Sequence, residues 1–172
     1  MKKNKKIKLT SANEAKKRMK NSINFLNKSE FVKVDKSEDR ILSENIISNF
    51  NIPEEDNSAV DGYAFNIKNN EKIFTLVGES KPGSPFHKSL NSTETIKIFT
   101  GSNILKRNKI NTVVMLEDCK PLKNSVEIKK KFKIGQNIRK KGEDVKKNKI
   151  VFIKGRKIRS VDLSQLLSLG IT

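Results

Sequence analysis

Apolar residues near the start of the chain recur at the spacing of an amphipathic helix. The tetrapeptide SANE places Ser11 and Glu14 three residues apart, where each side chain can satisfy an exposed backbone N–H group. We therefore expect a helix that begins at Ser11 and ends near Asn27. The apolar positions on one face of this helix are Ala15, Met19, Ile23 and Leu26.

The middle of the chain, from Ile73 to Ile128, shows a different pattern. Its apolar residues come in short runs rich in β-branched side chains, namely KIFTLVG, TIKIF, NTVVML and SVEIK. Clusters of turn-forming residues such as KPGSPF and TGSN separate these runs. Several short strands with such spacing predict a small β-rich domain.

The segments on either side of this region mix helix and strand patterns. Before it we expect a short helix over residues 37–42 and a strand at ENIIS; after it we expect strands at KIVFI and RKIRS. The end of the chain predicts a helix with Ser160 as its cap and Gly170 as its stop. Its apolar face would carry Leu163, Leu166 and Leu167.

These patterns predict an α+β fold with a discontinuous first domain. Residues 1–50 and 135–172 would form the two segments of that helical and β domain, and residues 51–134 would form a small β-rich domain inserted between them. The sequence SLGIT ends on an apolar isoleucine one residue before the C-terminus, where a finished domain usually has a polar tail. We therefore expect that the chain continues into a further domain in related proteins.

The high net charge of the chain does not by itself indicate a nucleic-acid or membrane partner. The formal net charge is +18, but the lysines are spread along nearly every segment, arginine occurs at only six positions, and there is one tyrosine and no tryptophan. Specific nucleic-acid binding usually needs clustered basic residues and stacking side chains, so we expect no specific nucleic-acid partner. A single cysteine and a single histidine give no disulfide and no metal-ligand spacing of their own. Without a secretory signal or an apolar run long enough to span a membrane, we expect a cytoplasmic protein with no membrane partner.

The segment DNSAVDGYA, residues 56–64, stands out because it lacks lysine in a lysine-rich chain. Asp56, Asn57 and Ser58 can cap or close a turn, and a glycine at position 62 can adopt a positive φ, so one interpretation is a tight loop bonded to itself. The other is that Asp61, beside this glycine, faces a ligand, a metal or a phosphate-bearing substrate. The residues alone leave both open.

Seven blocks, in order along the chain, resemble the molybdopterin molybdenumtransferases, the family of bacterial MoeA and of the gephyrin E domain. DNSAVDGYA resembles the DNSAMDGYA signature of that family. The other blocks extend over residues 38–171, which makes the resemblance far more specific than one turn motif. They are DRILSENIIS followed by IP, then GSPFH, IKIFTGSNIL, TVVMLED, GQNIRKKGEDV and LLSLGI.

The resemblance implies a function and an assembly. Family members insert molybdate into the dithiolene of adenylylated molybdopterin with release of AMP, and they require a divalent cation, Mg²⁺. They are elongated homodimers of four domains, in which a β domain is inserted into a discontinuous first domain. Their cleft lies between the second domain of one subunit and the third and fourth domains of the other. The expected ligands are therefore a small-molecule pterin and molybdate.

The resemblance also implies site residues. Asp61 and Thr100 would be catalytic, Asp61 would be a metal ligand, and the Thr100 hydroxyl with the Gly101 amide would hold an anionic oxygen. An ion-paired brace around a glycine turn is expected from Arg139, Gly142, Glu143 and Asp144. The remaining expected substrate-binding residues are Asp56, Asn57, Ser58, Gly62 and Glu117.

The chain departs from the family pattern in several places. Glu54 and Glu55 replace an apolar pair before DNS, and Val60 replaces the usual methionine. The sequence SLGIT falls where the family's third domain begins, so the third and fourth domains would be absent or encoded separately. We therefore expect half of an enzyme, inactive alone. The alternative is a non-catalytic dimerisation or binding module that keeps the fold.

Overall fold

The structure, a computed structural model, describes residues 9–24, 28–68 and 71–172. The chain divides into two units, Met1–Lys33 and Val34–Thr172. Each unit is described by itself below. Within the described residues, no helix combines the length and the apolar character that crossing a membrane requires.

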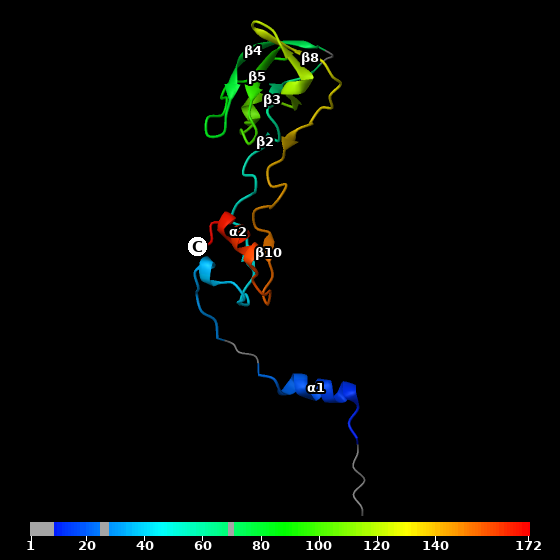
Figure 1. The fold of residues 1–172 in the computed structure, drawn as a ribbon, viewed down its shortest axis with the longest axis vertical. Helices are drawn as coiled ribbons and strands as arrows, with labels where there is room; N and C mark the ends of the chain where they lie inside the picture. Colours follow the sequence, from blue (N-terminus) through cyan, green and yellow to red (C-terminus); the bar gives the residue numbers. More distant parts are fainter. Residues whose placement is uncertain (1–8, 25–27, 69–70) are drawn as a thin grey trace, which may run out of the picture. The chain divides into compact units, whose positions relative to one another are not determined.

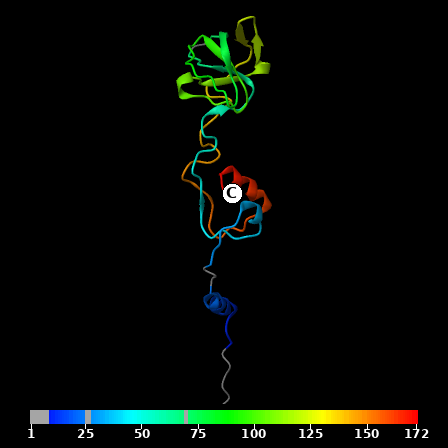
Figure 2. The ribbon, with the colours of Figure 1, turned by 90° about the vertical axis from the view of Figure 1, so that its left-hand side faces the viewer.

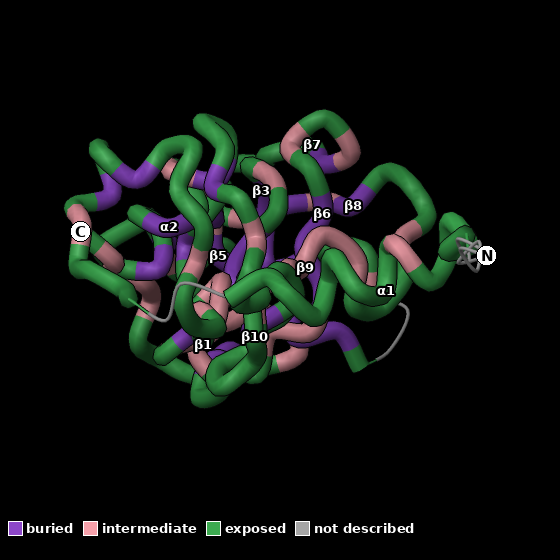
Figure 3. Tube along the Cα trace, turned by 90° about the horizontal axis from the view of Figure 1, so that it is seen from below, coloured by how far each residue is buried: buried purple, intermediate pink, exposed green. Residues whose placement is uncertain are grey.

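The described residues of the first unit contain one helix, α1 (Ala12–Ser22). Ser11 caps it as predicted, because its hydroxyl oxygen accepts a hydrogen bond of 3.2 Å from the Glu14 N–H. The helix ends at Ser22, earlier than predicted, and the expected last turn with Leu26 and Asn27 lies outside the described residues. No residue of α1 is buried, as Figure 3 shows, so none of the described residues of this unit covers its apolar face.

The second unit is built around a six-stranded sheet with the strand order β6-β3-β5-β4-β8-β7 (Figure 1). All neighbours are antiparallel except β4 and β5, which are parallel. Four of the strands coincide with the predicted apolar runs, whereas β3 and β7 were not expected. The strands are β3 (Gly62–Phe65), β4 (Ile73–Ser80), β5 (Glu94–Ile98), β6 (Thr112–Met115), β7 (Cys119–Pro121) and β8 (Ser125–Ile128).

Strand β3 is buried on both faces because it separates two hydrophobic clusters. Tyr63 and Phe65 belong to one cluster, and Ala64, between them, belongs to the other. Alternating side chains of a strand point to opposite faces, so a single short strand supplies both cores. Phe65 and Phe74 meet edge to face, with ring centroids 4.6 Å apart. Cys119 is also buried, as expected for a packing residue, and burial raises the pKa of its thiol to about 12.

A third cluster lies between segments from the two ends of the second unit. Strand β1 (Ile46–Ile47) pairs with β10 (Ile150–Phe152), and helix α2 (Ser160–Ser168) packs against the 3₁₀ helix η1 (Val34–Lys36), as Figure 2 shows. The buried members of this cluster are Val34, Phe152, Ile158 and Leu166.

Two further contacts join the chain where it enters and leaves the sheet region. Strand β2 (Asn57–Ser58) pairs with β9 (Ile138–Arg139), and Ile52 forms a bridge with Val145. The segments before and after the sheet therefore pair with each other, in an α+β fold. The boundaries 1–50, 51–134 and 135–172 stay a prediction.

Three element predictions were wrong. The helix expected over residues 37–42 is absent; η1 ends at Lys36, and Asp39 takes a left-handed conformation with φ 65° that interrupts any helix. The strand expected at RKIRS is reduced to one bridge between Lys157 and Ile41. Ser160 is the first residue of α2 and not its cap.

Helix α2 begins on an ionic arrangement instead of a serine cap. The Asp162 carboxylate accepts a hydrogen bond of 3.0 Å from the Arg159 N–H and further bonds from the guanidinium groups of Arg156 and Arg159. Asp162 is buried. The Arg156 side chain is the main cause that holds the pKa of Asp162 well below its ordinary range.

We expect the variant Asp162→Asn to be less stable than the natural chain at pH 7, with a difference that narrows in acid. A lowered folded-state pKa contributes stability that is present above the unfolded pKa, about 3.9, and is lost as pH falls toward the folded value. Urea unfolding at pH 7 and at several values below about pH 4 measures this. The exposed Asp35→Asn is the control; an equal, pH-independent loss in both variants would contradict the assignment.

Candidate functional site

Asp61 and Thr100 meet at one end of the sheet. Asp61 immediately precedes β3, Thr100 follows β5, and these antiparallel strands pair Gly62 with Ile98. One oxygen of the Asp61 carboxylate, Oδ1, accepts hydrogen bonds from the Thr100 N–H, at 2.8 Å, and from the Thr100 hydroxyl, at 2.7 Å. The strand register therefore positions the two residues that the sequence singled out as catalytic.

The Asp61 carboxylate is ionised and open to solvent. The hydrogen bond from the Thr100 N–H, followed by that from its hydroxyl and by the charge of Lys97, lowers the pKa of Asp61. Asp61 is exposed, and its second oxygen, Oδ2, has no hydrogen-bond partner among the described residues. One oxygen is thus fixed by the protein, and the other is available to a ligand.

Gly62 is required for a reason other than the one predicted. Its φ is not positive; it is the first residue of β3 and pairs with Met115 of β6. A Cβ at this position would lie 2.1 Å from the backbone oxygen of Val114. Close approach of two strands, and not a left-handed turn, therefore excludes any side chain next to Asp61.

Gly101 does not offer its amide to an anion. Its N–H donates a hydrogen bond of 2.8 Å to the backbone oxygen of Ser58, within a turn in which Gly101 has φ 79°. The Thr100 hydroxyl donates to Asp61. The predicted pair of donors for an anionic oxygen is therefore occupied inside the protein, and the binding of an anion by Thr100 and Gly101 stays a prediction.

The first three residues of the motif bind the segment that follows the sheet, residues 138–141. The Asp56 carboxylate accepts bonds of 2.8 Å from the Lys141 N–H and 2.9 Å from the Lys140 ammonium group. Burial acts to raise the pKa of Asp56, but these bonds outweigh it and the net shift is downward. Asn57 and Ser58 form β2 and are buried. These residues are thus bonded to a segment distant in the sequence, whereas Asp61 is open.

The expected brace is present. The Arg139 guanidinium group donates to the carboxylates of Glu143, at 2.7 Å, and Asp144. Gly142 has φ 70°, its N–H donates to the Pro53 backbone oxygen at 2.9 Å, and a Cβ there would lie 2.9 Å from the Asn51 side-chain oxygen. Since Arg139 also pairs with Asn57 in the β2–β9 ladder, the brace adjoins the motif.

The residue before Glu117 is bonded to the backbone of Asp61, but the Glu117 side chain makes no hydrogen bond to Asp61. Glu117 is exposed in the 3₁₀ helix η3 (Leu116–Asp118), and the N–H of Leu116 donates to the Asp61 backbone oxygen at 3.3 Å. The described residues contain no group of three or more His, Cys, Asp or Glu side chains that could hold a metal ion. Because Mg²⁺ is usually held by one or two carboxylates together with water and substrate phosphates, the role of Asp61 as a metal ligand stays a prediction.

Two residues beside the site were missed by the sequence interpretation. Lys97 contributes to the low pKa of Asp61, and its ammonium group lies 5.2 Å from the centre of the Phe99 ring. Phe99, expected in the core, is only half-buried. The signal was available in IKIFTG, since alternation along β5, continued one residue past its end, places Lys97 and Phe99 on the same face.

Three known proteins show what the chain is similar to. A molybdopterin molybdenumtransferase of Haemophilus influenzae is 33% identical over 166 residues, which cover 95% of this chain and 41% of that protein. One of Staphylococcus epidermidis is 29% identical over 148 residues, covering 82% of this chain and 35% of the relative. The crystal structure of the molybdopterin biosynthesis moeA protein from Pyrococcus horikoshii OT3 matches with a TM-score of 0.85 at 32% identity, over 95% of this chain and 45% of that one.

The chain spans less than half the length of these relatives. Within that part, the similarity extends over almost every residue: the family model described as MoeA N-terminal region (domain I and II) matches residues 10–170. The motif blocks, the fold and the family model agree. The chain therefore belongs to the MoeA family, as its N-terminal region.

Proposed function

We propose that this chain is the N-terminal part of a molybdopterin molybdenumtransferase, which inserts molybdate into adenylylated molybdopterin with release of AMP. The observation that carries the proposal is the Asp61 carboxylate, with one oxygen fixed by Thr100 and the other open to solvent. The relatives from Haemophilus influenzae and Staphylococcus epidermidis carry that name, which supports the assignment.

In this proposal, Asp61 acts as a preorganised anion. Its low pKa keeps it ionised at neutral pH, and Thr100 prevents the carboxylate from rotating. Such a group can accept a hydrogen bond from a pterin N–H donor and hold the substrate in register without rearrangement when the reaction occurs. Gly62 keeps the adjacent strands close and so fixes the position from which Asp61 projects.

The site needs a second wall. Asp61, Thr100 and Gly101 are all exposed, so a substrate bound there would remain in water on its far side. We propose that the remaining domains of the transferase, contributed by a homodimer partner or a separately encoded half, close the site. The chain alone is accordingly expected to be inactive.

For the divalent cation, we propose a limited role of this chain. Asp61 Oδ2 is one free carboxylate oxygen of the kind that Mg²⁺ prefers. The remaining oxygens would come from the substrate, from water or from the second wall. The cation would supply a positive charge near the anionic substrate groups.

The expected result of Asp61→Asn is a loss of about 100-fold or more in molybdenum insertion, the scale of removing one preorganised group from a site. The assay uses a chimera in which residues 10–170 replace the matching part of the Haemophilus influenzae relative, since the natural chain alone is expected to be inactive. Asn is isosteric with Asp, so the fold should persist, and Asp35→Asn is the control.

The possible outcomes test different parts of the proposal. Full activity of the Asp61→Asn chimera would contradict the role of the carboxylate. Rescue of a transferase-deficient strain by the 172-residue chain alone would contradict the need for a second wall. A folded chimera without activity would favour the non-catalytic module.

A further inference from the structure

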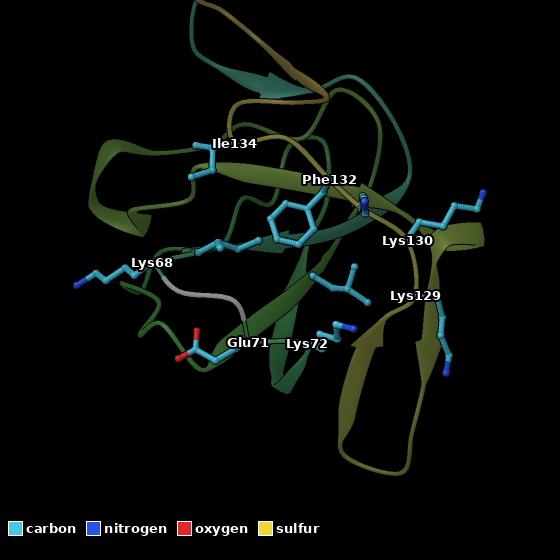
Figure 4. A pocket seen from close by; sticks show the side chains of 10 residues that line it. Lys68, Glu71, Lys72, Lys129, Lys130, Phe132 and Ile134 are labelled. Atoms are coloured by element: carbon cyan, nitrogen blue, oxygen red, sulfur yellow. The ribbon is translucent and has the colours of Figure 1, made fainter.

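A pocket lies at the other end of β3 from Asp61. It has a volume of about 590 Å³ and is lined by described residues from the β3–β4 connection, by Ile128 at the end of β8, and by residues that follow β8. Figure 4 shows Phe132 and Ile134 on one side of it and Glu71 and Lys72 on the other. Its volume is in the range of small-molecule sites, about 300–1,000 Å³. Nothing in the Asp61 site uses these residues.

The rim of the pocket is strongly basic. Five lysines line it against one glutamate; they are Lys68, Lys72, Lys129, Lys130 and Lys131. Lys129 is paired with Glu127 at 2.9 Å, and Lys130 is paired with Asp118. The other three form no ion pair that joins them to another described residue, although Glu71 lines the same pocket and Lys72 acts on the nearby Glu127. Five lysines against one lining glutamate leave an excess of positive charge at the rim, which favours an anionic ligand.

The floor of the same pocket is apolar. Ile67 and Ile128 are 5% and 3% exposed and belong to the hydrophobic cluster on one face of the sheet, and Phe132 packs against that cluster. Phe132 is half-buried, so part of its ring remains accessible from the pocket. An inorganic anion would satisfy the lysines but would leave this aromatic surface in water. A ligand with a ring satisfies both.

We propose that this pocket binds a small phosphate ester that carries an aromatic ring, with the lysines neutralising the phosphate and Phe132 contacting the ring. Lysine binds phosphate as a flexible point charge, which suits a rim of three separate ammonium groups. A nucleic acid is a poorer fit, because the pocket is a local hollow between two short segments and the remaining lysines are spread over the chain instead of forming a continuous track.

The test uses the whole chain and three probes: ADP, pyrophosphate without a ring, and adenosine without a phosphate. Calorimetric titration at about 0.15 M salt, where weak surface attraction is screened, should show tighter binding of ADP than of either fragment. The double variant Lys72→Gln/Lys131→Gln should bind ADP about tenfold more weakly. Phe132→Leu keeps an apolar contact and should reduce the preference for ADP over pyrophosphate.

The matched control removes the same charge elsewhere. Lys16→Gln/Lys17→Gln changes two exposed lysines of α1 and should leave ADP affinity within about twofold. Backbone NMR with ADP should shift the signals of the residues that line the pocket, among them Ile67, Lys72 and Phe132. The proposal would be overturned if both double variants bound ADP equally more weakly, or if binding did not saturate at millimolar ADP. NMR shifts at Asp61 and Thr100 in place of the pocket residues would also overturn it.

Discussion

Replacing Gly62 by alanine should lower the free energy of unfolding by about 3 kcal/mol or more, the upper range for a group forced into a packed interior. The added Cβ would lie 2.1 Å from the Val114 backbone oxygen and 3.3 Å from the Met115 Cα atom. Because the obstacle is backbone, only separation of β3 from β6 can relieve it. Urea unfolding at pH 7 measures the loss.

Gly83→Ala is the control for this prediction. Gly83 has φ 77° and no atom within 4 Å of an added Cβ, so its cost should be limited to the left-handed backbone, about 1 kcal/mol. If both variants lose the same stability, the steric account of Gly62 fails. If Gly62→Ala is too unstable to purify, a lower soluble yield than that of Gly83→Ala would show that Gly62→Ala is the less stable variant.

The second large effect is expected for Phe65→Ala, with a loss of about 3–5 kcal/mol in the free energy of unfolding. Phe65 and Phe74 are both 0% exposed, and their rings meet at an interplanar angle of 62°. Truncation leaves a cavity in the hydrophobic cluster beside β3 and removes the contact between the Phe65 and Phe74 rings. Chemical denaturation, with the m-value checked for constancy, measures it.

Phe31→Ala provides the matched comparison, since the Phe31 side chain is fully exposed. It should change the stability by less than about 0.5 kcal/mol. Phe65→Leu should lie between the two, because it restores part of the volume. A Phe65→Ala variant as stable as Phe31→Ala would show that the cluster around β3 does not hold the sheet together.

Sequence patterns predicted those elements in which propensity and tertiary packing agree. The Ser11 cap is local, and the runs that became β4, β5, β6 and β8 are β-branched and bounded by turn residues. The signal for β3 was weak because Gly62 and Ala64 have low strand propensity. They occupy a central strand because neighbouring backbones and two cores approach closely there. No local pattern carries that information.

The site was predictable in its residues and not in its hydrogen bonds. The family resemblance pointed to Asp61 and Thr100, and the strand register brings them together. Which donors and acceptors remain free depends on partners distant in sequence. The Gly101 N–H donates to the Ser58 backbone oxygen, and Lys140 and Lys141 donate to the Asp56 carboxylate. Such pairings follow from the assembled backbone, so a motif alone cannot assign them.

The β1–β10 pair has a consequence for the order in which the chain acquires its structure. Ile46 cannot meet Phe152 until synthesis has passed residue 152, whereas all six strands of the large sheet lie between Gly62 and Ile128. Contacts between distant residues form late because closing a long loop costs entropy. On the ribosome, the sheet can therefore mature first, and the ends of the second unit join only after it is in place.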